Sequence, residues 1–294
     1  MIQGALRLFL MIVLVGCVLL PHALVAGDAE SVAPSLEELL LNGAVKGKVK
    51  RLWGGNDVKF VIRIEDGSKQ GLKVIFRPEH LVDEWKHRKE ISAYRLARLS
   101  GIDNVPVTVS RALPQKFFKN AGEKTLARLV FREGMLEGAV QVFVNGAHDP
   151  LGEEGYAWAR DHLAALSEPA QPITMDLGEA RQFSRLLVFD FLQSNPDRFS
   201  GGNLLQTDDG SYWFIDNADA YFGCTRPKRR VQQLSHFDRT QVAALRQLTK
   251  SGLEGELRAL LGPKQVGRIW KRLQVVLQRV DGLIAEHGED NVLF

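Results

Sequence analysis

Hydrophobic and polar residues alternate over residues 58–65, a pattern that is typical of a strand with one buried face. The apolar side comprises Val58, Phe60, Ile62 and Ile64, and the polar positions Lys59, Arg63 and Glu65 lie largely on the other side. The dipeptide Asp66-Gly67 is a hairpin turn signal, and residues 72–77 have the composition of a second strand. The pattern therefore predicts a β-hairpin over residues 58–77.

Helical signals stand on both sides of this hairpin. Ser35 is followed three residues later by Glu38, which is the capping-box signature of a short helix. A longer helix is predicted over residues 82–99. Two further strands are predicted at residues 126–131 and 139–144. Up to about residue 145, the chain is expected to be rich in β-structure with one long helix.

The second half of the chain has mainly helical periodicity. Helices are predicted at residues 152–166, 177–193, 238–249 and 264–287, and short strands at 204–205 and 212–215. In the last helix, apolar residues recur from Val266 to Ile284 at helical spacing, which favours core packing over a binding surface.

Together these elements predict an α+β protein with two lobes. A lead-in with the short helix is expected at residues 28–45, a small β-rich N-lobe at 46–145 and a larger, mainly helical C-lobe at 146–294. Many folds share this outline, so the positions of the charged residues are needed to narrow the choice of fold.

The N-terminal residues form a separate segment. Residues 8–20 are nearly all apolar and lie between Arg7 and Pro21, which is typical of a signal peptide that ends near residue 27. Two alternatives stay open: an uncleaved anchor, for which the run is short, and a lipoprotein signal in which Cys17 is acylated. We expect an exported protein, periplasmic or extracellular, or lumenal in a eukaryote. Membrane attachment is expected only if this segment is retained or Cys17 is lipidated.

The composition of the 294 residues excludes several classes of protein. Hydrophobic residues make up 45% and charged residues 25%, the usual balance of a globular chain, which argues against disorder, collagen-like repeats and coiled coils. The net charge of +3 gives no reason to expect a nucleic-acid partner. Two cysteines cannot build a disulfide scaffold, and cleavage of the signal would leave Cys224 unpaired.

One group of charged residues lies where a core is expected. Alternation along the second strand places Lys73 and Arg77 on one face. Glu90 lies on an apolar stripe of the following helix, three or four residues before Ala93 and Tyr94. A carboxylate in that position needs a cation, and Arg77 or Lys73 would supply it. The pair is either an ordinary helix-to-sheet ion pair or the cation–Glu pair that holds nucleotide phosphates in kinases.

A second group occurs in VFDFLQSNPDRFSGGNLLQTDDGSYWFIDNADAYFG, residues 188–223. Asp197 opens a loop, Asn203 follows six residues later, and Asp216 follows an apolar strand. Phosphoryl transfer uses this arrangement: the first Asp orients or deprotonates a hydroxyl, and the Asn and second Asp bind magnesium or manganese. The alternative is that all three residues are turn formers and caps.

The same stretch resembles the catalytic segment of the secreted kinases of the four-jointed and Golgi casein-kinase group and, more distantly, that of HipA-type and phosphoinositide-type kinases. The earlier stretch IFRPEH…HRKEISAYRLARLSGIDNVPVTVSRAL resembles that group's phosphate-contacting strand and its Glu-bearing helix. GAVQVFV resembles the strand that enters the hinge, and QQLSHFDRTQVAALRQL the helical end of four-jointed proteins. The resemblance covers about residues 70–250 and implies a bilobal protein-kinase-like fold that uses ATP with Mn²⁺ or Mg²⁺.

The resemblance also implies roles for single residues. Glu90 matches the helix Glu, Asp197 the catalytic Asp, and Asn203 and Asp216 the metal ligands. Arg77 stands where casein-kinase-type members have Lys, a change from a compact to a forked cation. Four-jointed-type members resemble this chain in carrying Arg near this position. Lys73 is a second candidate for the phosphate contact. The loop from Asp197 to Asn203 is one residue longer than usual, and the group's Golgi members are richer in disulfides, so a bacterial exported relative fits better.

The sequence leaves two candidate functions, one an enzyme and the other a binding module. One is an exported kinase that phosphorylates a protein Ser/Thr or a sugar hydroxyl; the other is a pseudokinase that binds nucleotide or a partner. The basic stretch RPKRR at residues 226–230 is either a solvated loop or a docking site for an acidic substrate. The sequence leaves the acceptor and the oligomeric state open.

Overall fold

The structure is a computed structural model that describes residues 34–52, 57–169, 171–221 and 223–294. The predicted signal segment and Cys17 lie outside these residues. No helix in the described part of the chain has both the length and the apolar character needed to cross a membrane.

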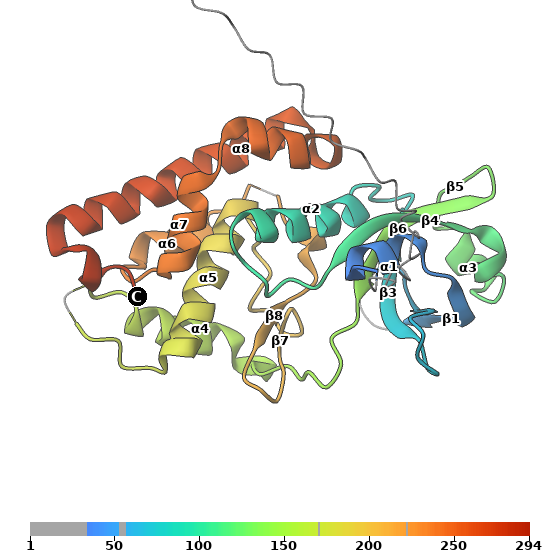
Figure 1. Ribbon diagram of the computed structural model, residues 1–294, viewed down its shortest axis with the longest axis horizontal. Helices are drawn as coiled ribbons and strands as arrows, with labels where there is room; N and C mark the ends of the chain where they lie inside the picture. Colours follow the sequence, from blue (N-terminus) through green and yellow to red (C-terminus); the bar gives the residue numbers. More distant parts are fainter. Residues whose placement is uncertain (1–33, 53–56, 170, 222) are drawn as a thin grey trace, which may run out of the picture. The chain divides into compact units, whose positions relative to one another are not determined.

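An antiparallel sheet forms the N-lobe (Figure 1). Its strand order is β1-β2-β3-β6-β4, and β5 pairs with β6. The strands are β1 (Val45–Leu52), β2 (Lys59–Ile64), β3 (Leu72–Pro78), β4 (Thr108–Pro114), β5 (Phe131–Arg132) and β6 (Met135–Val142). The helices of this half are α1 (Leu36–Asn42), α2 (Lys86–Leu99) and α3 (Glu123–Leu126), with a 3-10 turn η1 (Gln115–Phe118).

Aromatic packing organises the core of this lobe. The rings of Phe60 and Phe76 lie 5.0 and 5.5 Å from that of Phe118, and all three side chains are buried. Gly138 on β6 faces β3 so closely that an added Cβ would lie 2.5 Å from the carbonyl oxygen of Arg77. A residue without a side chain at this position therefore lets β3 and β6 pair beside the Phe76 ring.

Helices dominate the C-lobe, together with one small hairpin. The helices are α4 (Gly155–Ala165), α5 (Leu177–Gln193), α6 (Arg226–Gln233), α7 (Arg239–Gln247) and α8 (Lys250–His287). The hairpin strands are β7 (Leu204–Gln206) and β8 (Tyr212–Phe214), and the 3-10 turns are η2 (Gly152–Glu154), η3 (Asn217–Asp219) and η4 (Glu289–Asn291). Asp176 caps α5 through a hydrogen bond from the backbone of Glu179, and the buried face of α5 runs through the centre of the lobe. The expected α+β organisation with two lobes is present.

The helix α2 connects the two lobes. It lies beside α8 in Figure 1 and packs against η3, β4 and β6 as well. Its buried residues Ala93, Tyr94, Leu96 and Ala97 belong to the same hydrophobic core as α5 and α8. Glu90, one turn earlier, points instead toward β3.

Several elements differ from the sequence prediction. The strand predicted at 126–131 is wrong: α3 ends at Leu126, and β5 begins only at Phe131. The strands β1 and β4 were not predicted, because β1 lacks apolar alternation and β4 contains Arg111 and ends in Pro114. The helix predicted at 264–287 is confirmed as the second part of α8, and the structure adds an unpredicted helical segment before it. Gly262, with a φ of 74°, interrupts the helix between the two parts, just before Pro263.

Candidate functional site

The loop after α5 brings two predicted site residues into contact. Ser194 ends α5 in the left-handed conformation, and Asn195 Oδ1 then accepts a hydrogen bond from the backbone N–H of Asp197. Asn203 Nδ2 donates to the Asp197 carboxylate (3.0 Å) and to its carbonyl oxygen (2.8 Å). Both side chains are only partly exposed. The loop is thus closed on itself with the Asp197 carboxylate at its surface.

Two glycines shape the loop from Asp197 to Asn203, which is one residue longer than the family resemblance leads us to expect. Gly201 and Gly202 have φ values of 98° and 73°, in the region that favours glycine. The N–H of Gly202 donates to Asp149 Oδ2 (2.8 Å), which anchors the loop from outside. The extra length therefore coexists with the contact between Asp197 and Asn203.

Arg198 joins this loop to the segment that carries Asp216. Its side chain is fully buried, and Nη1 donates to the carbonyl oxygens of Asn203 (2.5 Å) and Ile215 (2.7 Å). The N–H of Ile215 in turn donates to the Asn203 carbonyl oxygen (3.1 Å). Asp216 follows directly, so Arg198 fixes the place of Asp216 relative to Asn203. Sequence analysis missed this role, because residue types reveal neither the burial of Arg198 nor its carbonyl partners.

Asp216 lies between two cations. Its Oδ1 is 2.7 Å from Arg77 Nη2, and its Oδ2 is 2.6 Å from Lys59 Nζ. Its backbone is left-handed (φ 51°), a conformation that is uncommon outside glycine and that marks functional sites. Burial would raise the pKa of Asp216, but the charges of Arg77 and Lys59 outweigh it and hold that pKa far below its usual value.

Arg77 is the centre of the charge cluster. Its guanidinium is buried and contacts Asp57 Oδ2 (2.8 Å) in addition to Asp216. Glu90 Oε1 lies 3.1 Å from Arg77 Nη2, within ion-pair distance but without hydrogen-bond alignment. Burial raises the pKa of Glu90, although the charge of Arg77 opposes this. The expected contact between Glu90 and a cation of the preceding strand is therefore present, and Arg77 supplies it.

Lys73 does not take part in the cluster. Its ammonium lies 3.2 Å from the centre of the Phe143 ring, a cation–π contact. It shares a face with Arg77, but four residues at about 3.3 Å each separate them by roughly 13 Å along the strand. The second cation at Asp216 is Lys59, on the neighbouring strand.

Register explains the position of Lys59. Phe60 pairs with Phe76 across β2 and β3, so Lys59 and Arg77 are the next residues at the same end of the two strands. Sequence analysis placed Lys59 on the polar side of β2 but gave it no role. Since Arg77 is on the matching side of β3, a correct register would have revealed the pair.

An outer ion-pair layer surrounds Arg77. Lys86 Nζ lies 2.9 Å from Asp57 Oδ1 and 3.4 Å from Asp219 Oδ1. Burial would raise the pKa of Asp57, but the hydrogen bond from Lys86 and the charge of Arg77 lower it. Burial would lower the pKa of Lys86, and the contacts with Asp57 and Asp219 raise it instead. Asp57 and Lys86 are therefore both charged near neutral pH.

A cavity of about 140 Å³ adjoins the cluster. Lys59, Arg77 and Asp216 line its charged side. Its other walls are mainly apolar, formed by Leu52, Ile75, Val142, Phe143, Val144, Leu205 and Ile215, with Gln141. Residues of β1, β2, β3 and β6 thus line the cavity together with Phe143 and Val144, and so do Leu205 of β7 and Ile215 and Asp216 after β8.

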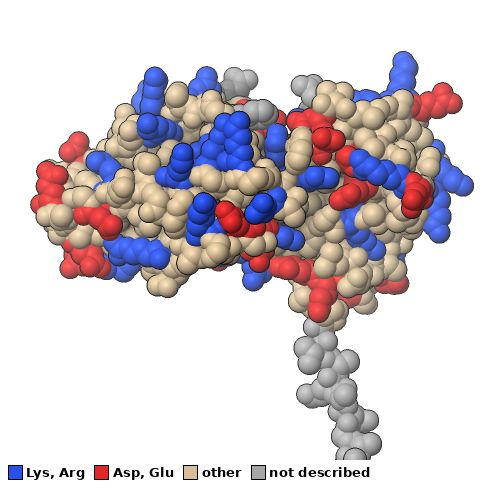
Figure 2. Space-filling view, turned by 90° about the horizontal axis from the view of Figure 1, so that it is seen from above, with Lys and Arg blue, Asp and Glu red and all other residues tan. Residues whose placement is uncertain are grey.

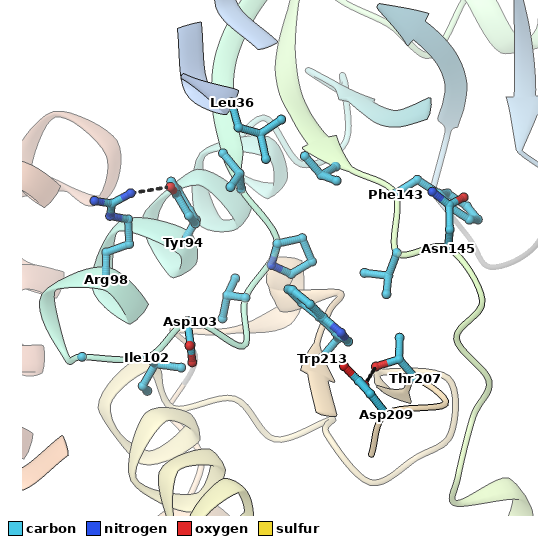
Figure 3. A pocket seen from close by; sticks show the side chains of 16 residues that line it. Leu36, Tyr94, Arg98, Ile102, Asp103, Phe143, Asn145, Thr207, Asp209 and Trp213 are labelled. Atoms are coloured by element: carbon cyan, nitrogen blue, oxygen red, sulfur yellow. Dashed lines mark hydrogen bonds between the residues drawn. The ribbon is translucent and has the colours of Figure 1, made fainter. Parts of the chain in front are cut away.

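A larger cavity of about 640 Å³ shares residues 142–144 with the first one. Figure 3 shows Trp213 at its centre, with Leu36 and Tyr94 on one side and Phe143 and Asn145 on another. None of the predicted site residues lines it. This larger cavity therefore contains none of the charged side chains of the cluster around Arg77.

The donor atoms of the site suit a hard divalent ion. Asn203 directs Nδ2 to Asp197, and its Oδ1 accepts no hydrogen bond from the residues that the structure describes. The Asp216 carboxylate follows one residue after the Ile215–Asn203 backbone contact. Amide and carboxylate oxygens are the donors that Mg²⁺ and Mn²⁺ accept. The residues present therefore fit such an ion.

The basic stretch after Asp216 is a helix rather than a loop. It forms α6, in which Arg226, Lys228 and Arg229 are exposed. Arg230 instead places its guanidinium 4.5 Å from the centre of the Phe199 ring. The face of the molecule in Figure 2 carries basic and acidic side chains on both lobes.

The chain resembles known proteins in its sequence and in its fold. No protein-family model matches it. In sequence it is 23% identical to the human pseudokinase FAM20A, in an alignment of 305 positions that covers 81% of this chain and 56% of that protein. The chain thus spans little more than half the length of this relative.

Solved structures extend the comparison to the fold. The crystal structure of the Golgi casein kinase has a TM-score of 0.60 and 18% identity, with 88% of this chain and 77% of that chain covered. The structure of hydra Fam20 with sugar has a TM-score of 0.65 and 15% identity, with 88% and 90% covered. A further structure of the Golgi casein kinase contains Mn and ADP and has a TM-score of 0.58. The chain therefore has the bilobal kinase-like fold of the Fam20 and Golgi casein kinase structures and is similar to that group in sequence.

Proposed function

We propose that this chain is an exported ATP-dependent kinase that phosphorylates a protein Ser/Thr or a sugar hydroxyl. One observation carries the proposal: the contact between Asp197 and Asn203 is tied through Arg198 to Asp216, which faces Arg77 and Lys59. The kinase-like fold and the similarity to the Fam20 and Golgi casein kinase group support it.

Part of the nucleotide is assigned to the cavity beside the charge cluster, since about 140 Å³ is less than a whole nucleotide fills. The apolar residues Ile75, Leu205 and Ile215 suit the faces of a base, and Arg77 and Lys59 suit phosphate oxygens. Glu90 holds the Arg77 guanidinium in place from the buried side. Asn203 and Asp216 would hold Mn²⁺ or Mg²⁺, and the Golgi casein kinase structure with Mn and ADP supports this assignment. When bound, the ion would offset the negative charge that develops on the phosphates.

Asp197 is assigned to the acceptor. Its carboxylate orients the attacking hydroxyl and accepts its proton as the hydroxyl oxygen bonds to the γ-phosphorus and ADP leaves. Asn203 Nδ2 holds the Asp197 carboxylate from one side, which leaves its other oxygen for the hydroxyl. If the predicted signal segment directs export, the acceptor is expected outside the cytoplasm.

A pseudokinase is the second candidate. The similarity to the pseudokinase FAM20A supports it, and so do Arg77 in place of Lys and the longer loop between Asp197 and Asn203. In that case the chain would bind nucleotide or a partner without transferring phosphate. The joint presence of Asp197, Asn203 and Asp216 favours the kinase.

The test measures phosphate transfer by the purified protein. Labelled ATP and MnCl₂ are supplied with either a mixed protein substrate or a panel of sugar glycosides, and Asp197→Asn serves as the matched control. Label that enters an acceptor with the wild type but not with Asp197→Asn supports the proposal. Tight ATP binding by the wild type without transfer or hydrolysis would favour the pseudokinase.

A further inference from the structure

We infer that Lys59 occupies the place of the divalent ion on Asp216, so that metal and nucleotide bind this chain as a coupled pair. This inference rests on the proposed function of the site. It adds a regulatory role for one residue: Lys59 suppresses metal binding until nucleotide phosphates accept its charge.

The first step is the state of the Asp216 carboxylate. Oδ1 accepts from Arg77 at 2.7 Å and Oδ2 from Lys59 at 2.6 Å, so a cation already contacts each oxygen. A divalent ion requires direct contact with at least one of these oxygens, at about 2.0–2.1 Å for an ion the size of Mg²⁺. Each oxygen keeps a second lone pair, but two neighbouring cations repel an incoming dication, so the departure of one of them favours binding of the ion.

The second step decides which cation moves. Arg77 is held on further sides by Asp57 (2.8 Å) and Glu90 (3.1 Å), and its side chain is 8% exposed. Lys59 has Asp216 as its one ion-pair partner among the described residues, and its side chain is 17% exposed. A lysine also has a flexible four-carbon stem and a single charged end. Lys59 is thus the cation that can leave Asp216.

The third step is the charge balance. Without phosphates, a dication at Asp216 would lie close to the charges of both Arg77 and Lys59, and the repulsion would weaken its binding. Nucleotide phosphates give Lys59 a new anionic partner, and Asp216 then becomes available to the ion. By linkage, each ligand must raise the affinity of the other by the same factor.

A permanent bridge between the lobes is the alternative explanation of the Lys59–Asp216 pair. In that case, loss of Lys59 would lower the stability of the fold and would leave or weaken the affinity for metal. The two explanations therefore predict opposite changes in the affinity for Mn²⁺ measured without nucleotide.

The experiment titrates Mn²⁺ into the full chain by calorimetry, without nucleotide and with a saturating non-hydrolysable ATP analogue. For the wild type, we expect weak binding of Mn²⁺ by itself and much tighter binding with the analogue. For Lys59→Met, we expect Mn²⁺ to bind about tenfold more tightly without the analogue, and the gain from the analogue to shrink. The affinity for the analogue itself should fall, since a phosphate contact is lost.

Two further variants complete the design. Lys46→Met removes the same charge at the far end of the hairpin, where Lys46 bonds the Ser68 carbonyl oxygen, and should behave as the wild type. Lys59→Arg keeps the positive charge and replaces Lys59→Met in the design if that variant fails to fold. Without the ATP analogue, Lys59→Arg should bind Mn²⁺ as weakly as the wild type does. A tight metal-only affinity in Lys59→Arg would contradict the inference.

The outcomes separate this inference from the proposed function. If the wild type transfers phosphate but Lys59→Met binds Mn²⁺ no more tightly than the wild type does without the analogue, the role of Lys59 is overturned. The proposed kinase function then still stands. A wild type that binds no Mn²⁺ even with the analogue overturns both.

Discussion

Arg198 and Asp190 form an ion pair inside the C-lobe, with 3.1 Å between Nη2 and Oδ1 and both side chains almost fully buried. Burial raises the pKa of Asp190, and the charge of Arg198 opposes this. The same guanidinium holds the carbonyl oxygens of Asn203 and Ile215. Stability and site geometry therefore depend on one side chain.

We predict that Arg198→Met destabilises the protein by about 3–5 kcal/mol, because it leaves a buried carboxylate and two carbonyl oxygens without their donor. Urea unfolding followed by circular dichroism measures the change. Arg181→Met, an exposed residue of α5 without an ion pair among the described residues, is the matched control. A loss below about 1 kcal/mol for Arg198→Met would contradict the central role of this residue.

The second prediction concerns Asp197. Its replacement by Asn should lower the rate of phosphate transfer by about 10²–10⁴-fold, because the group that accepts the proton is lost. Nucleotide affinity should change little, since Asp197 acts on the acceptor in the transition state. Transfer assays and calorimetric titration of ATP with Mn²⁺ measure the two quantities separately.

Asp216→Ala supplies the contrast to Asp197→Asn. It should lose affinity for both metal and nucleotide, because the ion that links Asp216 to the phosphates no longer has its carboxylate. Asn203→Ala should show a smaller loss of the same kind, since a neutral amide contributes less than a carboxylate. Full transfer activity in Asp197→Asn would show that this loop has another role.

A pH dependence follows from the depressed pKa of Asp216. A carboxyl group whose pKa is lower in the folded state stabilises the fold fully above its unfolded pKa, about 3.9, and loses this effect as the pH falls toward the folded pKa. We predict that Asp216→Asn is less stable than the wild type at pH 7 and that the difference shrinks below about pH 4. Unfolding in urea at pH 7, 5 and 3 tests this. A difference that grows on acidification would contradict the assigned ion pairs.

The close approach of β3 and β6 gives a prediction for the fold. Gly138→Ala would place a Cβ 2.5 Å from the Arg77 carbonyl oxygen and 2.7 Å from the Phe76 ring. We expect a loss of about 1–3 kcal/mol in the free energy of unfolding. Thermal melting measures it.

Gly282→Ala is the matched control for this substitution. Gly282 lies on the exposed side of α8, where an added Cβ meets nothing within 4 Å. It should stabilise the helix by up to about 1 kcal/mol. Equal effects of Gly138→Ala and Gly282→Ala would contradict the packing described for β6.

Local patterns predicted the elements with strong periodicity. The alternation from Val58 to Ile64 predicted β2, and the helical stripe after Val266 predicted the second part of α8. By contrast, β1 and β4 depend on pairing with distant strands, and their own residues carry little periodicity. The helix α6 has a strongly basic sequence, which resembles a solvated loop when its buried neighbours are unknown.

The contacts among the candidate site residues were predicted in part for a similar reason. Asp197, Asn203 and Asp216 lie close together in the sequence, so their spacing alone suggested one site. Arg77 and Glu90 lie on a strand and on the helix that follows it, so their contact could also be predicted from neighbouring elements. Lys59 was missed because its partner Asp216 is 157 residues away and because the register of β2 and β3 decides its position. Arg198 was missed because its role depends on carbonyl groups from two segments, which residue types do not reveal.

The packing of α2 has a mechanical consequence. Four of its buried residues belong to the C-lobe core, and Ser92 Oγ donates to the hydroxyl of Tyr221, so this helix would travel with the C-lobe if the lobes separated. Glu90 would travel with it, while Arg77 would stay with the sheet. Separation of the lobes would therefore lengthen the Glu90–Arg77 contact, and the distance between these two side chains would report how far the lobes have closed. Fluorophores on Arg88 and Lys50 would register this motion as a change in energy transfer when the ATP analogue binds.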